Sequence, residues 1–477
     1  MNLVYGIKDK PKFGQVVLFA LQQLLAIMAA TIAVPAVVGN GMSASAALFG
    51  AGVGTIVYLL FTKSSSPVFL GSSFAFIGSM FSAFGGAASV SIGYAGLILG
   101  ALIAGLVYVI IALIVKFCGV KWIDKLMPPV IIGPTVAIIG LSLAGNAIGD
   151  LMRSNVEGGS VYVALICGLV TLAVTMLCST YGKHMIKLIP FIIGILAGYL
   201  VASVFALIGK NTGNDALVVI NYEALHHVGS FVSLPEFSFT KADWSGVTSS
   251  YLLTIFVAYA PVAFVVFAEH LADHKNLSSI VGVDLLENPG LTNTLLGDGI
   301  GSFVGAFFGG CANTTYGESI ATVAITRNAS TVSIWGAAIA CIIFSLLTPL
   351  VAFLETIPSC VMGGVCVALY GFIAASGLKM LQPVDLNKNR NLFVASVIFI
   401  VGVGGMVVSF GAVEIRTVAC ALILGILTNL MLSGEKEEQK SNKAGSAQAE
   451  RYSRKTMLSR KERRAETKQS PLRRGGI

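Results

Sequence analysis

The chain has 477 residues, of which 55% are hydrophobic and only 11% are charged. Soluble domains carry about 25% charged residues, so this composition excludes an ordinary soluble protein and indicates a polytopic membrane protein. The formal net charge of +8 comes mostly from residues 435–477, which hold 13 Lys or Arg and 6 Asp or Glu.

Fourteen apolar segments are candidates for membrane spans, each of which needs about 20 predominantly apolar residues. The expected spans begin near residues 14, 44, 67, 94, 129, 160, 185, 248, 290, 312, 331, 358, 392 and 416. The third and the tenth are more polar than the others. Polar residues 1–13 lead directly into a full-length span, so we expect no cleavable signal.

Basic residues in the loops predict the orientation. If the N-terminus is cytoplasmic, the inward-facing loops hold eleven Lys and Arg and the outward-facing loops hold four. This asymmetry satisfies the positive-inside rule, so we expect both termini on the cytoplasmic side of a multi-pass protein in the cytoplasmic (inner) membrane. The inward set is Lys63, Lys116, Lys121, Lys125, Lys183, Lys187, Lys275, Arg327, Lys379, Lys388 and Arg390, and the outward set is Arg153, Lys210, Lys241 and Arg416.

A repeat relates the two polar spans. The segment GSSFAFIGS at 71–79 resembles NTTYGESIA at 313–321, which lies 242 residues later, and the same shift places the first span on the eighth. Because each repeat then has an odd number of spans, seven, the second repeat enters the membrane from the opposite side, as in many secondary transporters. The predicted fold is therefore an all-α membrane protein with 14 spans in two inverted seven-span repeats.

The repeat divides the chain into five parts, which are a cytoplasmic N-terminus (1–13), a first repeat (14–209), an extracytoplasmic connection (210–247), a second repeat (248–434) and a basic cytoplasmic tail (435–477). The tail has few apolar residues to bury, so we expect it to be disordered and solvated. Attraction to anionic lipids is the alternative, and nucleic-acid binding is not expected.

The polar segments 71–79 and 313–321 predict the position of a binding site. Polar backbone at membrane depth is tolerated only where it is buried in protein or lines a cavity. Both segments are rich in Ser or Thr, and each contains Gly, which allows the backbone to leave helical geometry. We expect discontinuous spans here, with substrate bound near the midplane.

Four carboxylates fall inside expected spans: Glu269, Asp273, Asp298 and Glu318. Such residues cost about 2.5–3.5 kcal/mol to insert, so they are functional candidates. Glu269 and Asp273 are four residues apart, share one helix face and should perturb each other's proton affinity. Glu318 is expected to bind a ligand or a proton.

Alternatives remain open for the residues near these carboxylates. Asp273 is either a coupling residue or a solvated residue at the helix end beside Lys275. For His270 and His274 we favour the cytoplasmic helix end. Asp298 lies between two glycines and is either functional or a local hydrogen-bonding residue.

The sequence contains no motif typical of a metal site, a nucleotide-binding site or an enzyme. The eight cysteines form no CxxC pair and are interpreted as small core residues. The chain has no Walker loop, HExxH or dinucleotide fingerprint. We therefore expect no enzyme, no catalytic residues, no metal and no cofactor. The pair of membrane carboxylates Glu269 and Asp273 makes a proton the expected coupling ion.

Six motifs resemble the nucleobase–cation symporter-2 family, also called the nucleobase/ascorbate transporters, over about residues 10–432. They are GSSFAFI (71–77), AEH (268–270), DLLENPGL (284–291), NTTYGESIATVAITR (313–327), MGGVCVALYG (362–371) and ASGLK (375–379). The run TTYGE is similar to the uracil permease branch rather than to the xanthine and urate branch.

The resemblance implies an architecture and a site. It implies a core domain of spans 1–4 and 8–11, a gate domain of spans 5–7 and 12–14, short strands in spans 3 and 10, and a homodimer. The implied substrate-binding residues are Ala30, Phe74, Glu269, Gly317 and Glu318. Ser73, Tyr316 and Tyr370 match positions near the pocket or gate. Glu269, Asp273 and Glu318 are the candidates for proton coupling.

Two residues depart from the pattern of the uracil permeases. That branch has a His four residues after the first glutamate, where this chain has Asp273 followed by His274. Ser319 stands where Asn is usual. The first departure leaves the identity of the coupling residue open.

The expected function is proton-coupled uptake of uracil across the cytoplasmic membrane. Transport of xanthine, urate or another nucleobase by the same fold is the main alternative. A third hypothesis is an anion transporter of similar architecture, which the two pocket glutamates disfavour. A pocket built to hydrogen-bond one edge of a ring rejects analogues that lack it, because its buried polar groups then stay unpaired.

Overall fold

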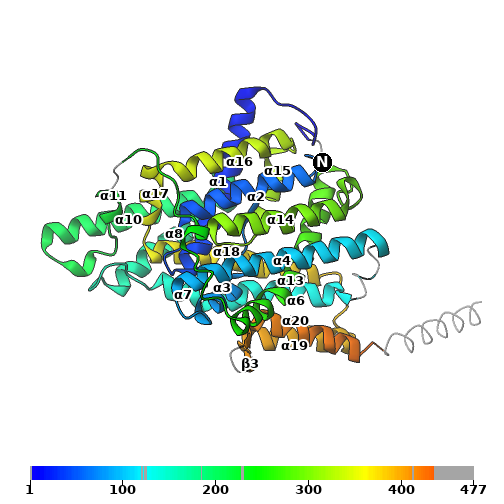
Figure 1. The fold of residues 1–477 in the computed structure, drawn as a ribbon. Helices are drawn as coiled ribbons and strands as arrows, with labels where there is room; N and C mark the ends of the chain where they lie inside the picture. The colour runs from blue at the N-terminus through cyan, green and yellow to red at the C-terminus, as the bar shows by residue number, and fades with distance from the viewer. Residues whose placement is uncertain are drawn as a thin grey trace, which may run out of the picture.

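The computed structural model describes residues 3–433 except 120–121, 123–125, 184, 227–229 and 411–412. This part of the chain is built almost entirely of helices, many of them running side by side (Figure 1). The basic tail, Lys121 and Lys125 lie outside the described residues. What the sequence predicts for them stays a prediction.

Eight helices in the described part of the chain are long and apolar enough to cross a membrane. They are α1 (Phe13–Val38), α2 (Ala44–Phe61), α4 (Val90–Cys118), α6 (Pro129–Ser142) continued by α7 (Ala144–Leu151), α8 (Val161–Tyr181), α10 (Pro190–Thr212), α13 (Ser249–Val281) and α18 (Ser359–Leu381). The chain is therefore a multi-pass membrane protein, as its composition predicted.

Shorter elements complete the fold. The further helices are α3 (Ile77–Gly85), α9 (Met185–Leu188), α11 (Glu223–His226), α12 (Ser238–Lys241), α14 (Leu291–Gly309), α15 (Gly317–Thr326), α16 (Thr331–Leu346), α17 (Thr348–Glu355), α19 (Asn389–Val403) and α20 (Thr417–Met431), with a 3-10 turn at Asp215–Leu217 and a π turn at Leu286–Gly290. Four three-residue strands form two antiparallel pairs: β1 (Leu70–Ser72) with β2 (Asn313–Thr315), and β3 (Val408–Phe410) with β4 (Val413–Ile415). Each of the fourteen expected segments begins within four residues of an observed helix or strand.

Local sequence signals set where several helices begin and end. Ser89 caps α4 by accepting a hydrogen bond from the amide of Ile92, and Thr248 caps α13 by accepting one from Tyr251. These hydroxyls satisfy amides that have no partner inside the helix. Gly310 follows α14 with a φ of 74°, a left-handed conformation that favours glycine, and this lets the chain turn out of the helix just before β2.

Contacts sort the spanning elements into two sets. One set packs α1, α2, α3, α4, α13, α14, α15 and α16 together, and the other packs α6, α7, α8, α10, α18, α19 and α20 together. The sets meet where α13 contacts α6 and α20, and where α1 contacts α10 and α18. In Figure 1, α19 and α20 lie along the lower edge and α10 projects to the left.

Helices α2 and α14 approach each other through glycines. A Cβ atom at Gly50 would lie 2.3 Å from the carbonyl oxygen of Gly305, and one at Gly54 would lie 2.7 Å from that of Gly301. Small residues allow such backbone contact between membrane helices, where apolar burial alone gives little association energy. This contact matters for the site because the side-chain amide of Asn313, in β2, donates to the Gly50 carbonyl oxygen at 3.1 Å.

We expect Gly50→Val to lower the melting temperature and the yield of monodisperse protein in detergent, because overpacking a tight interface typically costs about 1–3 kcal/mol. Gly149→Val in α7 is the matched control, since a Cβ atom there meets nothing within 4 Å. Equal thermal unfolding profiles for the two variants would contradict the close α2–α14 packing.

Candidate functional site

A cavity of about 450 Å³ lies at the junction of the two sets of helices. Its walls come from α1, β2, α13 and α15 with the turn after β1 on one side, and from α6, α8, α9, α10 and α18 on the other. Five of its lining residues have ionisable carboxyl or amino side chains: Lys187, Glu269, Asp273, Glu318 and Lys379. The cavity therefore brings together three of the four carboxylates that the sequence singled out.

The two strands hold the centre of the site. β1 pairs with β2 in the register Leu70 with Thr315, Gly71 with Thr314 and Ser72 with Asn313. The hydroxyl of Tyr316 donates to the carbonyl oxygen of Ser72 at 2.7 Å, which locks the end of β2 to β1. The two segments that resemble each other in the sequence are thus neighbours in space.

Each strand leads into a short helix whose N-terminus faces the cavity. Phe74 and Ala75 line it just before α3, and Gly317 and Glu318 line it in the first turn of α15. The first amides of a helix have no partner within it, and the helix dipole makes this end positive. The amides at the start of α15 are therefore available as donors beside the carboxylates, whereas the amide of Ile77 in α3 already donates to the carbonyl oxygen of Phe74 at 3.2 Å.

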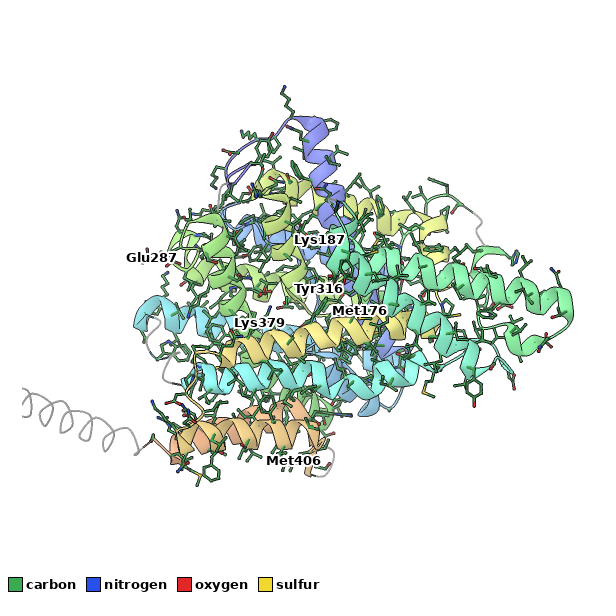
Figure 2. The ribbon with its side chains drawn as sticks, turned by 180° about the vertical axis from the view of Figure 1, so that it is seen from behind. Met176, Lys187, Glu287, Tyr316, Lys379 and Met406 are labelled. Carbon is green, nitrogen blue, oxygen red and sulfur yellow. The ribbon has the colours of Figure 1, made fainter. Side chains whose placement is uncertain are left out.

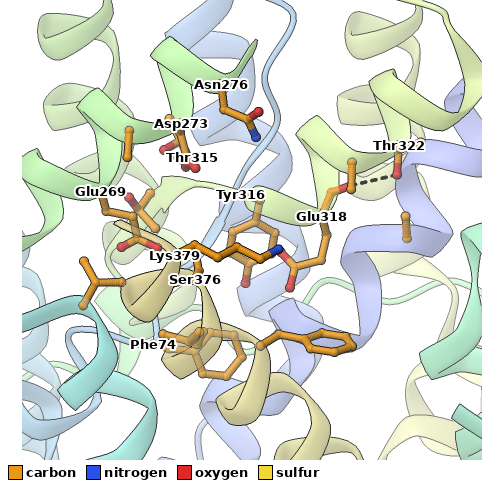
Figure 3. A pocket seen from close by; sticks show the side chains of 18 of the residues that line it. Phe74, Glu269, Asp273, Asn276, Thr315, Tyr316, Glu318, Thr322, Ser376 and Lys379 are labelled. Atoms are coloured by element: carbon orange, nitrogen blue, oxygen red, sulfur yellow. Dashed lines mark hydrogen bonds between the residues drawn. The ribbon is translucent and has the colours of Figure 1, made fainter. Parts of the chain in front are cut away.

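Glu269 and Asp273 lie on the same face of α13, as their spacing predicted, and both line the cavity (Figure 3). Asp273 accepts a hydrogen bond of 2.7 Å from the hydroxyl of Thr315 in β2. Within the described residues, no Lys or Arg nitrogen lies within 4.0 Å of Glu269, Asp273 or Glu318. Three carboxylates without a close cation favour binding of protons or of hydrogen-bond donors.

Among the other residues predicted for the pocket, Tyr316 lines the cavity and three do not. Ala30 is fully buried, and Ala26, one turn earlier on α1, lines the cavity instead. Ser73 is buried beside β1, and its amide donates to the carbonyl oxygen of Ala312 at 2.9 Å. Tyr370 is buried behind Phe74, with the two ring centroids 5.6 Å apart.

The expected position of the two histidines at a solvated helix end is wrong. His270 and His274 are both fully buried, because α13 continues to Val281 and turns them away from the cavity toward α2 and α14. The ring of His270 bonds Asp298 at 2.7 Å and Thr294 at 3.0 Å. His274 bonds the Tyr58 hydroxyl at 2.8 Å and the His270 carbonyl oxygen at 2.8 Å.

Asp298 is not a locally bonded residue. It is fully buried, and its partner His270 lies 28 residues earlier in the chain. This contact joins α14 to the face of α13 that points away from the cavity. Asp298 is thus a structural neighbour of the site rather than part of its lining.

Sequence reasoning missed several lining residues: Asn276, Thr322, Ser376, Lys187 and Lys379. The sequence analysis treats Lys187 as a loop cation, and Lys379 as a loop cation and the last residue of the ASGLK motif, with no role in the site for either. Their positions in the last turns of α9 and α18 gave no sign that they face carboxylates on other helices. Ser376 and Lys379 are three residues apart and so share a helix face, but this spacing does not reveal what that face contacts.

Ser319 does not line the cavity. Its hydroxyl accepts a hydrogen bond of 3.0 Å from the amide of Phe69 and also bonds the side-chain amide of Gln23. It therefore ties α15 to α1 and to the segment before β1. No group of three or more His, Cys, Asp or Glu in the described part of the chain is placed to hold a metal ion.

The fold and the site define a multi-pass membrane transporter rather than an enzyme. The family model described as "Permease family" matches residues 14–410. The chain belongs to this family, the nucleobase–cation symporter family, as its motifs indicated.

Curated relatives match nearly the whole chain. The uracil permease of Bacillus subtilis (strain 168) is 38% identical over 442 residues, which cover 91% of this chain and 96% of the relative. The uracil permease of Escherichia coli (strain K12) is 37% identical over 429 residues, covering 89% and 93%.

Solved structures share the fold at low identity. The transmembrane domain of the cyanobacterial bicarbonate transporter BicA has a TM-score of 0.60 at 14% identity, covering 89% of this chain and 99% of that chain. A murine Solute Carrier 26 family anion transporter in the inward-facing state has a TM-score of 0.61 at 13% identity, covering 90% and 69%.

Proposed function

We propose that this protein takes up uracil across the cytoplasmic membrane in symport with protons. The observation that carries the proposal is that Glu269 and Glu318, from two helices, line one cavity together with the turn before α3 and the first turn of α15. Uracil is a flat ring with two N–H donors and two carbonyl acceptors. The carboxylates accept from its N–H groups, and the helix amides donate to its carbonyl oxygens.

The face of the ring is covered by aromatic side chains. Phe74 and Tyr316 both line the cavity and approach it from the two strand ends (Figure 3). Tyr370 supports Phe74 from behind through its edge contact. Gly317 lines the cavity and presents its backbone to the ring, whereas Ala30 and Ser73 are buried outside the cavity lining.

The architecture that serves this function has fourteen spans in two inverted seven-span repeats. The β1–α3 and β2–α15 segments act as the discontinuous third and tenth spans, and their antiparallel pairing supports the inverted relation. The first helix set, with α1–α4 and α13–α16, is the core domain, and the second set, with α6–α10 and α18–α20, is the gate domain.

Protonation of the cavity carboxylates couples uracil transport to proton transport. When a carboxylate of the core domain binds a proton, the charge that must cross the membrane is smaller, so the loaded core domain moves more readily. Glu269, Asp273 and Glu318 are the proton carriers, and Asp273 takes the place of the family's His. Both termini are cytoplasmic, and the protein works as a homodimer in lipid.

Uracil is favoured over two other classes of substrate, purines and anions. The name "uracil permease" of the relatives supports uracil over xanthine or urate. The similarity to bicarbonate and Solute Carrier 26 transporters concerns the fold, and the three cavity carboxylates disfavour an anionic substrate.

Competition of uracil uptake by other substrates distinguishes these hypotheses. We expect excess unlabelled uracil to suppress uptake of radiolabelled uracil, while the same excess of xanthine, hypoxanthine or bicarbonate leaves it within about twofold, because the site's buried polar groups stay unpaired with the wrong ring edge. Inhibition by purines equal to that by uracil would overturn the assignment.

A further inference from the structure

The charges in the cavity are divided between its two walls. All three carboxylates, Glu269, Asp273 and Glu318, come from α13 and α15 of the first helix set. Both ammonium groups, those of Lys187 and Lys379, come from α9 and α18, which pack in the second set. The lining residues from α1, α6, α8 and α10 are uncharged.

Lys379 is placed to face the carboxylates. It lies in the last turn of α18, on the same face as the lining residue Ser376, and its side chain is exposed to the cavity. In the view of the close-up, the side chain of Lys379 is drawn between those of Glu269 and Glu318 (Figure 3). Seen from behind, Lys187 and Lys379 lie on either side of Tyr316 (Figure 2).

The Lys379 ammonium group has no fixed partner here. In the described part of the chain, no carboxylate oxygen lies within 4.0 Å of it. A cation that shares a cavity with three carboxylates, without being tied to one of them, is free to pair with whichever is ionised. A positive charge near a carboxylate favours its ionised form.

We propose that Lys379 promotes release of the transported proton from the core carboxylates on the cytoplasmic side, where the positive-inside rule places the end of α18 that carries Lys379. This inference rests on the proposed proton-coupled function. When substrate leaves, the ammonium group attracts the carboxylates of α13 and α15 and stabilises them without a proton. The proton passes to water in the cavity, and the carrier returns empty.

A comparison of net uptake with counterflow distinguishes a role of Lys379 in proton release from a structural role. Net uptake needs the carrier to release its proton in every cycle, whereas counterflow with saturating uracil on both sides exchanges substrate on a carrier that keeps its proton. We expect Lys379→Gln in proteoliposomes to lower net uptake by roughly tenfold and to leave counterflow within about twofold. Raising the internal pH should recover net uptake, and raising the external pH should not.

Further variants make the test specific. Lys379→Arg keeps the charge and should behave like the native protein, and Lys379→Glu should lower net uptake further than Gln does. Lys116→Gln is the matched control, because Lys116 also lies in the last turn of a long helix but not at the cavity. A merely structural lysine at a helix end contributes through the helix dipole, so its loss would lower net uptake and counterflow together.

Three outcomes would overturn the inference: equal loss of net uptake and counterflow in Lys379→Gln, no loss of either, or recovery by external rather than internal pH. Failure of the proposed function itself is distinguishable, because the native protein would then show either no uracil counterflow or counterflow without accumulation driven by a proton gradient.

Discussion

Glu269→Gln and Glu318→Gln are each expected to abolish concentrative uracil uptake, by about a hundredfold or more, while the protein stays in the membrane at the native level. Each glutamine keeps the size of the side chain but loses the charge and half of the acceptor capacity, which leaves a uracil N–H group unpaired in a buried site. Both glutamates line the cavity and neither has a cation within 4.0 Å in the described part of the chain.

The measurement is initial uptake of radiolabelled uracil in cells, normalised to membrane expression. Glu157→Gln is the matched control, since Glu157 is an exposed glutamate outside the cavity. Uptake near the native level in either cavity variant would remove that glutamate from the mechanism.

The second large effect concerns Asp273. Asp273→Asn is expected to shift or flatten the pH dependence of uptake while uracil binding is kept. The carboxylate faces the cavity one turn after Glu269, and removing its charge changes the balance of protons that the two groups share. Asp273→His should restore coupling with a different pH profile, because an imidazole titrates nearer neutrality.

Uptake measured as a function of external pH, together with equilibrium binding of uracil to purified protein, checks this expectation. Asp385→Asn, on an exposed loop between α18 and α19, is the control. A pH–uptake curve for Asp273→Asn that superimposes on the native curve would contradict a coupling role.

Much of the site could be predicted because it departs from the apolar background. Glu269, Asp273 and Glu318 stand out where charge is costly, and helix spacing alone places the first two on one face. The breaks at 71–79 and 313–321 were visible as polar runs inside apolar surroundings. β1 and β2 lie within or beside these runs.

The residues that sequence reasoning misplaced depend on contacts between distant segments. Hydropathy suggested that His270 and His274 reach water, but Asp298 and Tyr58 supply buried partners from α14 and α2. Lys379 was read as a loop cation because its helix gives no sign of the facing carboxylates. Both arrangements depend on residues that are distant in the sequence, so neither can be predicted from hydrophobic periodicity or composition.

Proton-driven uptake in proteoliposomes tests the central claim most directly. With purified protein, an imposed inward proton gradient should drive accumulation of radiolabelled uracil above its external concentration. A protonophore should collapse the accumulation, and vesicles carrying Glu269→Gln should show none. Accumulation that needs no proton gradient, or equilibration of uracil without any concentration, would contradict a proton-coupled uracil symporter.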